Sequence, residues 1–228
     1  MAAKAEPEKA EVRYDRQLRL WGNHGQAALS RAQVCLVGAT GTGTEALKSL
    51  VLPGIGGFCI ADDAKVTEED LGVNFFVTAD DLGQPRAKAT AEYLKELNPS
   101  VAGEWKEVDL RWASEEPGRL AFLTSYSLVI ASGIGDRLLA AMDRLLWEAN
   151  IPLLVLRSYG MIGYLRVSMR SQQAMETHPD NPAPDLRIAC PWPELKKLVQ
   201  EVDLDAMDHQ AHSHVPYAIL LFKAVENF

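Results

Sequence analysis

Short apolar runs alternate with amphipathic stretches along most of the chain. A run of about four apolar residues that ends in a glycine or an acidic residue is typical of a buried parallel strand. Apolar residues three or four positions apart are typical of a helix that covers a sheet. The pattern predicts strands at residues 34–37, 57–61, 101–110, 127–131, 151–156 and 163–169, and helices at residues 44–50, 85–97, 114–124 and 136–149. This alternation predicts a doubly wound, mostly parallel α/β sheet with helices on both faces.

The N-terminal residues depart from this alternation. Residues 1–12 are rich in Ala, Glu, Lys and Pro, which predicts a mobile tail with nothing to bury. Residues 14–22 carry apolar side chains at helical spacing, and Gly22 ends that pattern. A second short helix is predicted at residues 26–32, directly before the first strand.

The C-terminal part also departs from it. Residues 176–193 contain five prolines and predict a loop that leaves the domain. Helices are predicted at residues 192–202 and 215–228, and the second apolar pattern runs to the last residue. We therefore expect a Rossmann-like domain over residues 13–170. Residues 171–228 are expected to be the proline-rich loop and helices that begin an inserted domain, truncated within it.

Composition and charge exclude several classes of protein. The chain has 23 Lys and Arg residues against 31 Asp and Glu residues, a net charge of −8, so it lacks the excess of cations that binds nucleic acid. Its apolar runs end well before the roughly 20 residues that a membrane span needs. The odd number of cysteines, without C-x-x-C spacing, fits a reducing compartment. We expect neither a nucleic-acid partner nor a membrane.

A glycine-rich turn at residues 38–43 joins the first buried strand to the following helix. Its glycines are Gly38, Gly41 and Gly43, at the first, fourth and sixth positions rather than the first, third and sixth of the dinucleotide fingerprint. A helix N-terminus after such a turn offers free N–H groups to an anion. Asp62, at the end of the next strand, is placed to accept a ribose hydroxyl. The turn is either a degenerate nucleotide site or a set of glycines that only closes the strand–helix connection.

Several stretches resemble the ubiquitin-activating-enzyme (ThiF) family. The matching segments are YDRQLRLWG at 14–22, VCLVGATGTG at 34–43, LVLPGIG at 50–56, NFF at 74–76, RSYG at 157–160, HPDN at 178–181, DLR at 185–187, PEL at 193–195 and HSHVP at 212–216. The segments around Arg157, Pro179 and Pro193 favour one class within this family. It comprises the regulatory subunits, without a catalytic cysteine, of heterodimeric enzymes that activate Rub/Nedd-type modifiers. The family members are longer than this chain.

The resemblance also implies that parts of an adenylation site are missing. Val73 stands where active members have a phosphate-binding arginine, and Arg86 stands where they have a lysine. Residues 131–135 lack the acid that holds Mg²⁺, and the later Asp136 is predicted to be a helix N-cap. Asp62 remains at the ribose position. The resemblance implies an inactive adenylation domain without a cofactor, with ATP and Mg²⁺ held by the partner subunit.

The cysteines and histidines favour structural roles. Two cysteines lie in the middle of predicted strands, and the third lacks the Thr that follows the family's catalytic cysteine. The clustered histidines are interpreted as part of a polar loop, since a zinc site needs four well-placed ligands. We therefore expect no metal site and no catalytic thiol. The residues are Cys35, Cys59, Cys190, His209, His212 and His214.

Arg16 has two interpretations. Its position beside Tyr14 and Leu18 is compatible with the solvated face of a helix. The resemblance implies instead that Arg16 is donated across a dimer to the ATP of the partner subunit. The implied partners are a catalytic, cysteine-bearing subunit and a Rub/Nedd-type modifier, in the cytoplasm and nucleus. The alternatives are the regulatory subunit of a SUMO-activating enzyme, a self-sufficient adenylating or NAD-dependent enzyme, and a modifier-binding scaffold without nucleotide chemistry.

Overall fold

A computed structural model describes residues 13–109, 117–172 and 191–226. The chain divides into two compact units, one up to Gln172 and one from Gln173 onward. The tail predicted at residues 1–12 and most of the predicted proline-rich loop lie outside the described residues.

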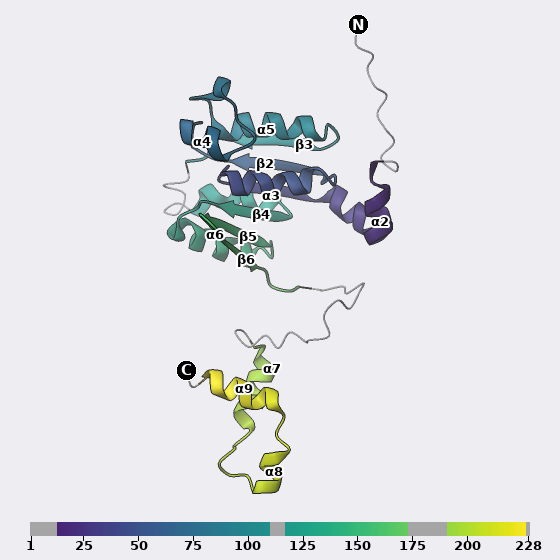
Figure 1. Ribbon diagram of the computed structural model, residues 1–228, viewed down its shortest axis with the longest axis vertical. Helices are drawn as coiled ribbons and strands as arrows, with labels where there is room; N and C mark the ends of the chain where they lie inside the picture. Colours follow the sequence, from purple (N-terminus) through teal and green to yellow (C-terminus); the bar gives the residue numbers. More distant parts are fainter. Residues whose placement is uncertain (1–12, 110–116, 173–190, 227–228) are drawn as a thin grey trace. The chain divides into compact units, whose positions relative to one another are not determined.

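The first unit is built on a six-stranded sheet in the order β3-β2-β1-β4-β5-β6 (Figure 1). Neighbouring strands are parallel except for β5 and β6, which form an antiparallel hairpin. The predicted α/β fold with a mostly parallel sheet is confirmed. The strands are β1 Gln33–Val37, β2 Gly57–Ala61, β3 Ala102–Lys106, β4 Leu128–Ser132, β5 Leu153–Tyr159 and β6 Ile162–Ser168.

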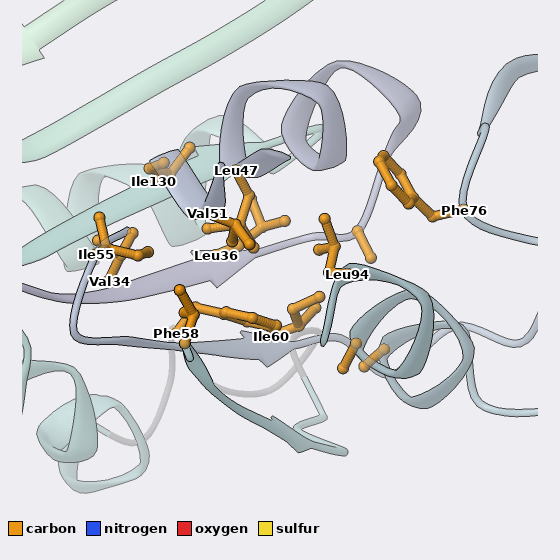
Figure 2. Close-up of a cluster of buried hydrophobic side chains, with 14 of the residues drawn as sticks. Val34, Leu36, Leu47, Val51, Ile55, Phe58, Ile60, Phe76, Leu94 and Ile130 are labelled. Atoms are coloured by element: carbon orange, nitrogen blue, oxygen red, sulfur yellow. The ribbon is translucent and has the colours of Figure 1, made fainter. Parts of the chain in front are cut away.

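Helices cover both faces of this sheet. On one face, Leu36 of β1 packs with Leu47 of α3 and Leu94 of α5 in the cluster that Figure 2 shows. On the other face, Val37 of the same strand packs with Met142 of α6. Successive residues of a strand point to opposite faces, which is why a continuous apolar run serves two cores. The helices are α3 Gly41–Val51, α5 Arg86–Leu97, α6 Asp136–Glu148 and a 3₁₀ helix at Pro117–Ser125.

Three elements differ from the prediction or were missed. The helix expected at 114–124 is the 3₁₀ helix, and residues 110–116 lie outside the described part. The short helix α4, Glu68–Val73, and a 3₁₀ turn at Ala79–Asp81 were not predicted, because neither is long enough to show a helical period. Thr67 and Asp70 start α4 with a reciprocal capping box.

The helix α2, Asp15–Arg31, precedes the sheet and is broken at Gly22 (φ 66°, ψ −179°). This break agrees with the two short helices that the sequence predicts. Because α2 leads into the start of β1, it lies at the opposite edge of the sheet from the glycine-rich turn, which follows the end of β1.

The second unit contains three helices, α7 Pro193–Glu201, α8 His209–Ser213 and α9 Tyr217–Glu226. The buried side chains of Val199, Ile219 and Phe222 belong to α7 and α9, the two helices that contact each other. The predicted helices at 192–202 and 215–228 are thus present with shorter bounds. Across the described residues, no helix combines the length and the apolar character that crossing a membrane requires.

Candidate functional site

The glycine-rich turn lies at the point where the strand order reverses, between β1 and β4. In open α/β sheets, this crevice at the carboxyl ends of the strands is the usual place for a ligand. Here the chain itself bridges it. Gly38 has a φ of +85°, and a Cβ on it would come within 2.1 Å of the Ser132 carbonyl oxygen at the end of β4. The hydroxyl oxygens of Thr40 and Ser132 are 2.5 Å apart.

The other two glycines also allow close approaches of protein atoms. A Cβ on Gly41 would lie 2.3 Å from the Val73 carbonyl oxygen, and one on Gly43 would lie 2.8 Å from the Ser132 Cβ. The end of α4 is therefore seated directly on the first turn of α3. All three glycines have a packing role, as the structural interpretation of the turn requires.

Asn74 fastens this segment to the turn. Its side chain is 3% exposed and donates from Nδ2 to the Ala39 carbonyl oxygen at 3.3 Å. Its Oδ1 accepts from Thr44 Oγ1 at 3.2 Å and from the Phe76 N–H at 3.0 Å. A buried amide satisfied on both sides holds the two segments in one register.

Asp62, the predicted ribose acceptor, is 2% exposed and bound by its own chain. Its Oδ2 accepts from the Ala39 N–H at 2.8 Å and from Arg86 Nε and Nη2 at 2.9 and 2.8 Å. Its Oδ1 accepts from the Ala64 N–H at 3.0 Å. The carboxylate therefore holds the turn after β1 and the first residue of α5 together.

Arg86 lies between two carboxylates. Its Nη1 donates to Asp70 Oδ1 at 2.9 Å, while Asp62 engages the other side of the guanidinium. Burial alone would lower the pKa of Arg86, but the charges of Asp62 and Asp70 outweigh it and raise that pKa. Burial alone would raise the pKa of Asp70, but the Thr67 N–H and the Arg86 guanidinium hold it below its ordinary value. The three charges sum to −1, which leaves little attraction for a triphosphate.

The charged and polar groups of the turn after β4 bind other residues of the same chain. Asp136 was predicted to be the N-cap of α6, and this is wrong: Gly135 is the N-cap, and Asp136 is the first helical residue. The reason is that Gly135 has extended backbone angles and takes the N-cap position, so the helix starts one residue earlier than an N-cap at Asp136 would need. The Asp136 carboxylate instead pairs with Arg157 of β5, whose Nη2 also donates to the Ile134 carbonyl oxygen at 3.3 Å.

Two cavities open at this edge of the sheet. One, of about 830 Å³, lies between the start of α3, Val73, the turn after β4 and the end of β5. The other, of about 430 Å³, is lined by Gly38, Asp62 and Arg86 together with residues 132–138. Val73, 65% exposed, brings no donor and no charge to the first cavity. Among the described residues, no group of three His, Cys, Asp or Glu side chains could hold a metal ion.

Arg16 does not belong to this site. It lies on the first half of α2, at the opposite edge of the sheet, and its side chain is exposed. Within the part of the chain that the structure describes, no hydrogen bond or ion pair involves the side chain of Arg16, whereas Arg19 pairs with Asp15 (Nη2–Oδ2 2.9 Å). The structure thus brings Gly38, Gly41, Gly43 and Asp62 together and leaves Arg16 apart.

Residues 14–200 match the ThiF family. The chain belongs to the ThiF family. It is 45% identical to the NEDD8-activating enzyme E1 regulatory subunit of Gallus gallus over 227 residues, 96% of this chain and 41% of that protein. It is 43% identical to the NEDD8-activating enzyme E1 regulatory subunit AXL of Arabidopsis thaliana, over 98% of this chain and 42% of that protein. The chain spans about two fifths of the length of these curated relatives.

A solved structure supports the ThiF fold. The E. coli tRNA N6-threonylcarbamoyladenosine dehydratase TcdA, in complex with ATP, superimposes with a TM-score of 0.56 at 23% identity, over 66% of this chain and 61% of that one. The predicted resemblance to the ThiF family, and within it to the N-terminal part of the regulatory subunits, is confirmed.

The cysteines of this ThiF-family chain lie as the sequence predicts, where the structure describes them. Cys35 and Cys59 are register neighbours on β1 and β2, and both are buried. A hydrogen bond with the Cys59 thiol, together with burial, raises the pKa of Cys35 well above its ordinary value, which makes it a poor nucleophile. Cys190 lies outside the described residues. His209 and His212 belong to α8, and the ring of His214 contacts the Gln210 carbonyl oxygen.

The roles of four residues at this edge were not predicted from the sequence. The residues are Asp70, Asn74, Ser132 and Arg157. Only Asp70 carries a local signal, because Thr67-x-x-Asp70 has the spacing of a capping box. The others act through hydrogen bonds to residues that are distant in the sequence, such as Arg157 with Asp136.

Proposed function

We propose that this chain is the N-terminal part of the regulatory subunit of a heterodimeric enzyme that activates a NEDD8-type modifier. A separate catalytic subunit holds ATP and Mg²⁺, adenylates the C-terminus of the modifier and forms the thioester on its own cysteine. This chain holds no cofactor of its own, and it works in the cytoplasm and nucleus. The observation that carries the proposal is the 45% identity to a NEDD8-activating enzyme E1 regulatory subunit over 96% of the chain.

Within this proposal, residues 13–170 are an inactive adenylation domain that follows a short tail at residues 1–12. Residues 171–228 are the start of an inserted helical domain. The division of the chain at Gln172 and the three short helices of the second unit support these bounds.

The chemistry of the glycine-turn edge supports an inactive adenylation domain. Adenylation needs cations on the triphosphate and a carboxylate for Mg²⁺. Here Arg86 is engaged by two carboxylates, Val73 brings no charge, and Asp136 is paired with Arg157. The fold is kept, while the groups that would act on ATP bind one another.

Arg16 is proposed to contact the ATP of the catalytic subunit. Its exposed guanidinium has no partner within the described residues, so it keeps its full capacity for a phosphate. An arginine supplied in trans makes nucleotide chemistry depend on assembly, as arginine fingers do. This role gives a subunit without an ATP site a direct part in the reaction.

ATP–pyrophosphate exchange tests the proposal. It is measured for this chain alone, for a candidate catalytic subunit alone and for both together, each with a NEDD8-type modifier, a SUMO-type modifier or none. We expect exchange that is stimulated by this chain and is selective for the NEDD8-type modifier. Exchange by this chain alone would instead identify a self-sufficient adenylating enzyme, and selectivity for the SUMO-type modifier would favour that regulatory subunit.

Calorimetry with Mg-ATP provides the matched control on the isolated chain. We expect no binding in the micromolar range, because the cations at the glycine turn are already paired. Modifier binding without exchange in any combination would support the scaffold. Fractionation of cells that express the protein checks its cytoplasmic and nuclear location.

A further inference from the structure

The first half of α2 is separated from the second half by a break in the helix. Gly22 has a φ of 66° and a ψ of −179°, a region of backbone angles that is essentially restricted to glycine. The half that carries Arg16, residues 15–21, is too short to be a stable helix by itself. The direction in which it points must therefore be fixed by side chains.

Gln26 is the side chain that connects the two halves. It is 8% exposed, and its Oε1 accepts from Gln17 Nε2 and from Trp21 Nε1, both at 3.2 Å. Both donors belong to the half that carries Arg16. The Gln26 Nε2 donates to the Pro53 carbonyl oxygen at 3.1 Å, and Gln17 Nε2 donates to the same oxygen at 3.0 Å.

Packing reinforces these hydrogen bonds. A Cβ on Gly25 would lie 2.7 Å from Trp21 Cδ1, so the indole ring folds back across the break and lies on Gly25. At the other end of the same half, the Tyr14 hydroxyl accepts from Asn98 Nδ2 at 2.9 Å. Arg16 thus lies between two anchored points on a short helix.

The hydrogen-bonding groups around position 26 favour glutamine there. A buried side chain there meets two N–H donors on one side and a carbonyl acceptor on the other. A glutamine amide supplies one acceptor and one donor in a single group, and it reaches farther than asparagine. An apolar side chain of the same size would leave the Trp21 and Gln17 donors without this acceptor.

We infer that Gln26 is a positioning residue that sets the direction of the Arg16 helix through Gln17, Trp21 and Pro53. The inference rests on the proposed function, in which Arg16 reaches the ATP of the catalytic subunit. Gln26 contacts neither subunit's substrate in this account. It acts by holding the helix that carries the arginine, since misplacing a charged group by about 1 Å can cost up to roughly 100-fold in rate.

Hydrogen exchange tests whether the hydrogen bonds of Gln26 hold the first half of α2 in place. It is measured on the chain alone and on the chain assembled with the catalytic subunit. The variant is Gln26→Met, which keeps the length and apolar stem of the side chain and removes the amide. We expect faster exchange in residues 15–21, with β1 and α5 unchanged. The matched control is Gln84→Met, since Gln84 also donates from Nε2 to a backbone oxygen, that of Asp80, but this hydrogen bond is exposed and lies outside α2. Unchanged exchange in residues 15–21 would overturn the inference.

Pyrophosphate exchange in the heterodimer tests the link to Arg16. We expect Gln26→Met to slow the exchange roughly tenfold, with dimer content unchanged. In an Arg16→Ala background, the same substitution should cause no further loss, because a positioning residue has nothing left to position. Additive losses, or a normal rate with Gln26→Met, would overturn the inference and leave the proposed function standing. A normal rate with Arg16→Ala in an intact dimer would instead remove the role proposed for the arginine.

Discussion

Arg86 and Arg16 are the same residue type in two regions of one molecule, with opposite surroundings. The Arg86 side chain is 18% exposed and lies between Asp62 and Asp70. Arg16 is exposed and, among the described residues, has no partner. A guanidinium that is bidentately engaged has little capacity left for a ligand, whereas an unpaired one keeps it. At the glycine-turn edge, the charge of Arg86 holds segments of the chain together. On α2, the charge of Arg16 remains free to bind another molecule.

The two regions also differ in how they are held. Arg86 joins the end of β2, the start of α4 and the start of α5, all packed against the sheet. Arg16 lies on a half-helix that is joined to the rest by a glycine break and a few side-chain hydrogen bonds. Substitutions in the first region should therefore change stability, and substitutions in the second should change activity.

The largest expected effect is that of Arg86→Met on stability. Removal of the guanidinium leaves the buried carboxylates of Asp62 and Asp70 uncompensated, at a cost of about 3–5 kcal/mol of unfolding free energy. Urea denaturation at neutral pH measures it. The matched control is Arg166→Met, whose pair with Asp143 (Nη2–Oδ2 3.1 Å) is partly exposed and should cost less than about 1 kcal/mol. Equal losses for the two variants would contradict the cohesive role of Arg86.

Arg16→Ala should change activity and leave stability within about 0.5 kcal/mol of the parent chain. In the proposed heterodimer we expect roughly ten- to hundredfold slower adenylate formation, less than for an arginine finger in phosphoryl transfer, because Mg²⁺ and the cations of the proposed catalytic subunit would share the charge. Pyrophosphate exchange over a range of ATP concentrations measures it, with dimer content checked by size exclusion. Arg19→Ala is the control, since Arg19 is already paired with Asp15.

Thr40→Val should weaken the contact between the glycine-rich turn and the end of β4. The Thr40 hydroxyl accepts from the Gly43 N–H at the start of α3 and lies 2.5 Å from the Ser132 hydroxyl. Loss of this cap and hydroxyl pair should cost about 1–2 kcal/mol in thermal or urea unfolding. Thr42→Val, which removes an exposed contact with Ser158, should cost less. Mg-ATP binding by Thr40→Val would mean that this hydroxyl contact, and not the lack of free positive charge, keeps the nucleotide out.

Most of the sheet could be predicted from the sequence because its signals are local. Apolar runs such as residues 34–37 predict strands. A strand that is buried on both faces of a parallel sheet has a nearly continuous run of apolar residues, which is easy to recognise in a sequence. The position of Gly38 and Asp62 at the carboxyl edge follows from the ends of those strands. The prediction that these residues lie at one edge of the sheet agrees with the structure, in which the Ala39 N–H of the turn donates to Asp62.

The side-chain contacts within the site could not be predicted from the sequence. Arg86 meets Asp62 and Asp70 across 24 and 16 residues, and Asn74 meets Ala39 across 35 residues, so no local period reports these contacts. The helix α4 was missed because its six residues are too few to show a helical period. The cap predicted at Asp136 was wrong because Gly135 takes the N-cap position, while the Asp136 carboxylate pairs with Arg157, 21 residues farther along the chain.

The smallest expected effect is a pH dependence of the stability that Asp70 contributes, one of the two carboxylates paired with Arg86. The Thr67 N–H and the Arg86 guanidinium, outweighing burial, hold the pKa of Asp70 below its ordinary value of 3.8. A carboxyl with a lower pKa in the folded state contributes stability above its unfolded pKa and loses that contribution as the pH falls through the folded value. The difference in urea midpoint between the parent chain and Asp70→Asn should therefore narrow as the pH falls from about 5 to about 3. Because the group is buried, the narrowing should persist at high salt, which screens exposed pairs more strongly. A difference that stays constant over this range would mean that the Thr67 N–H and the Arg86 guanidinium do not lower the pKa of Asp70 in the folded state.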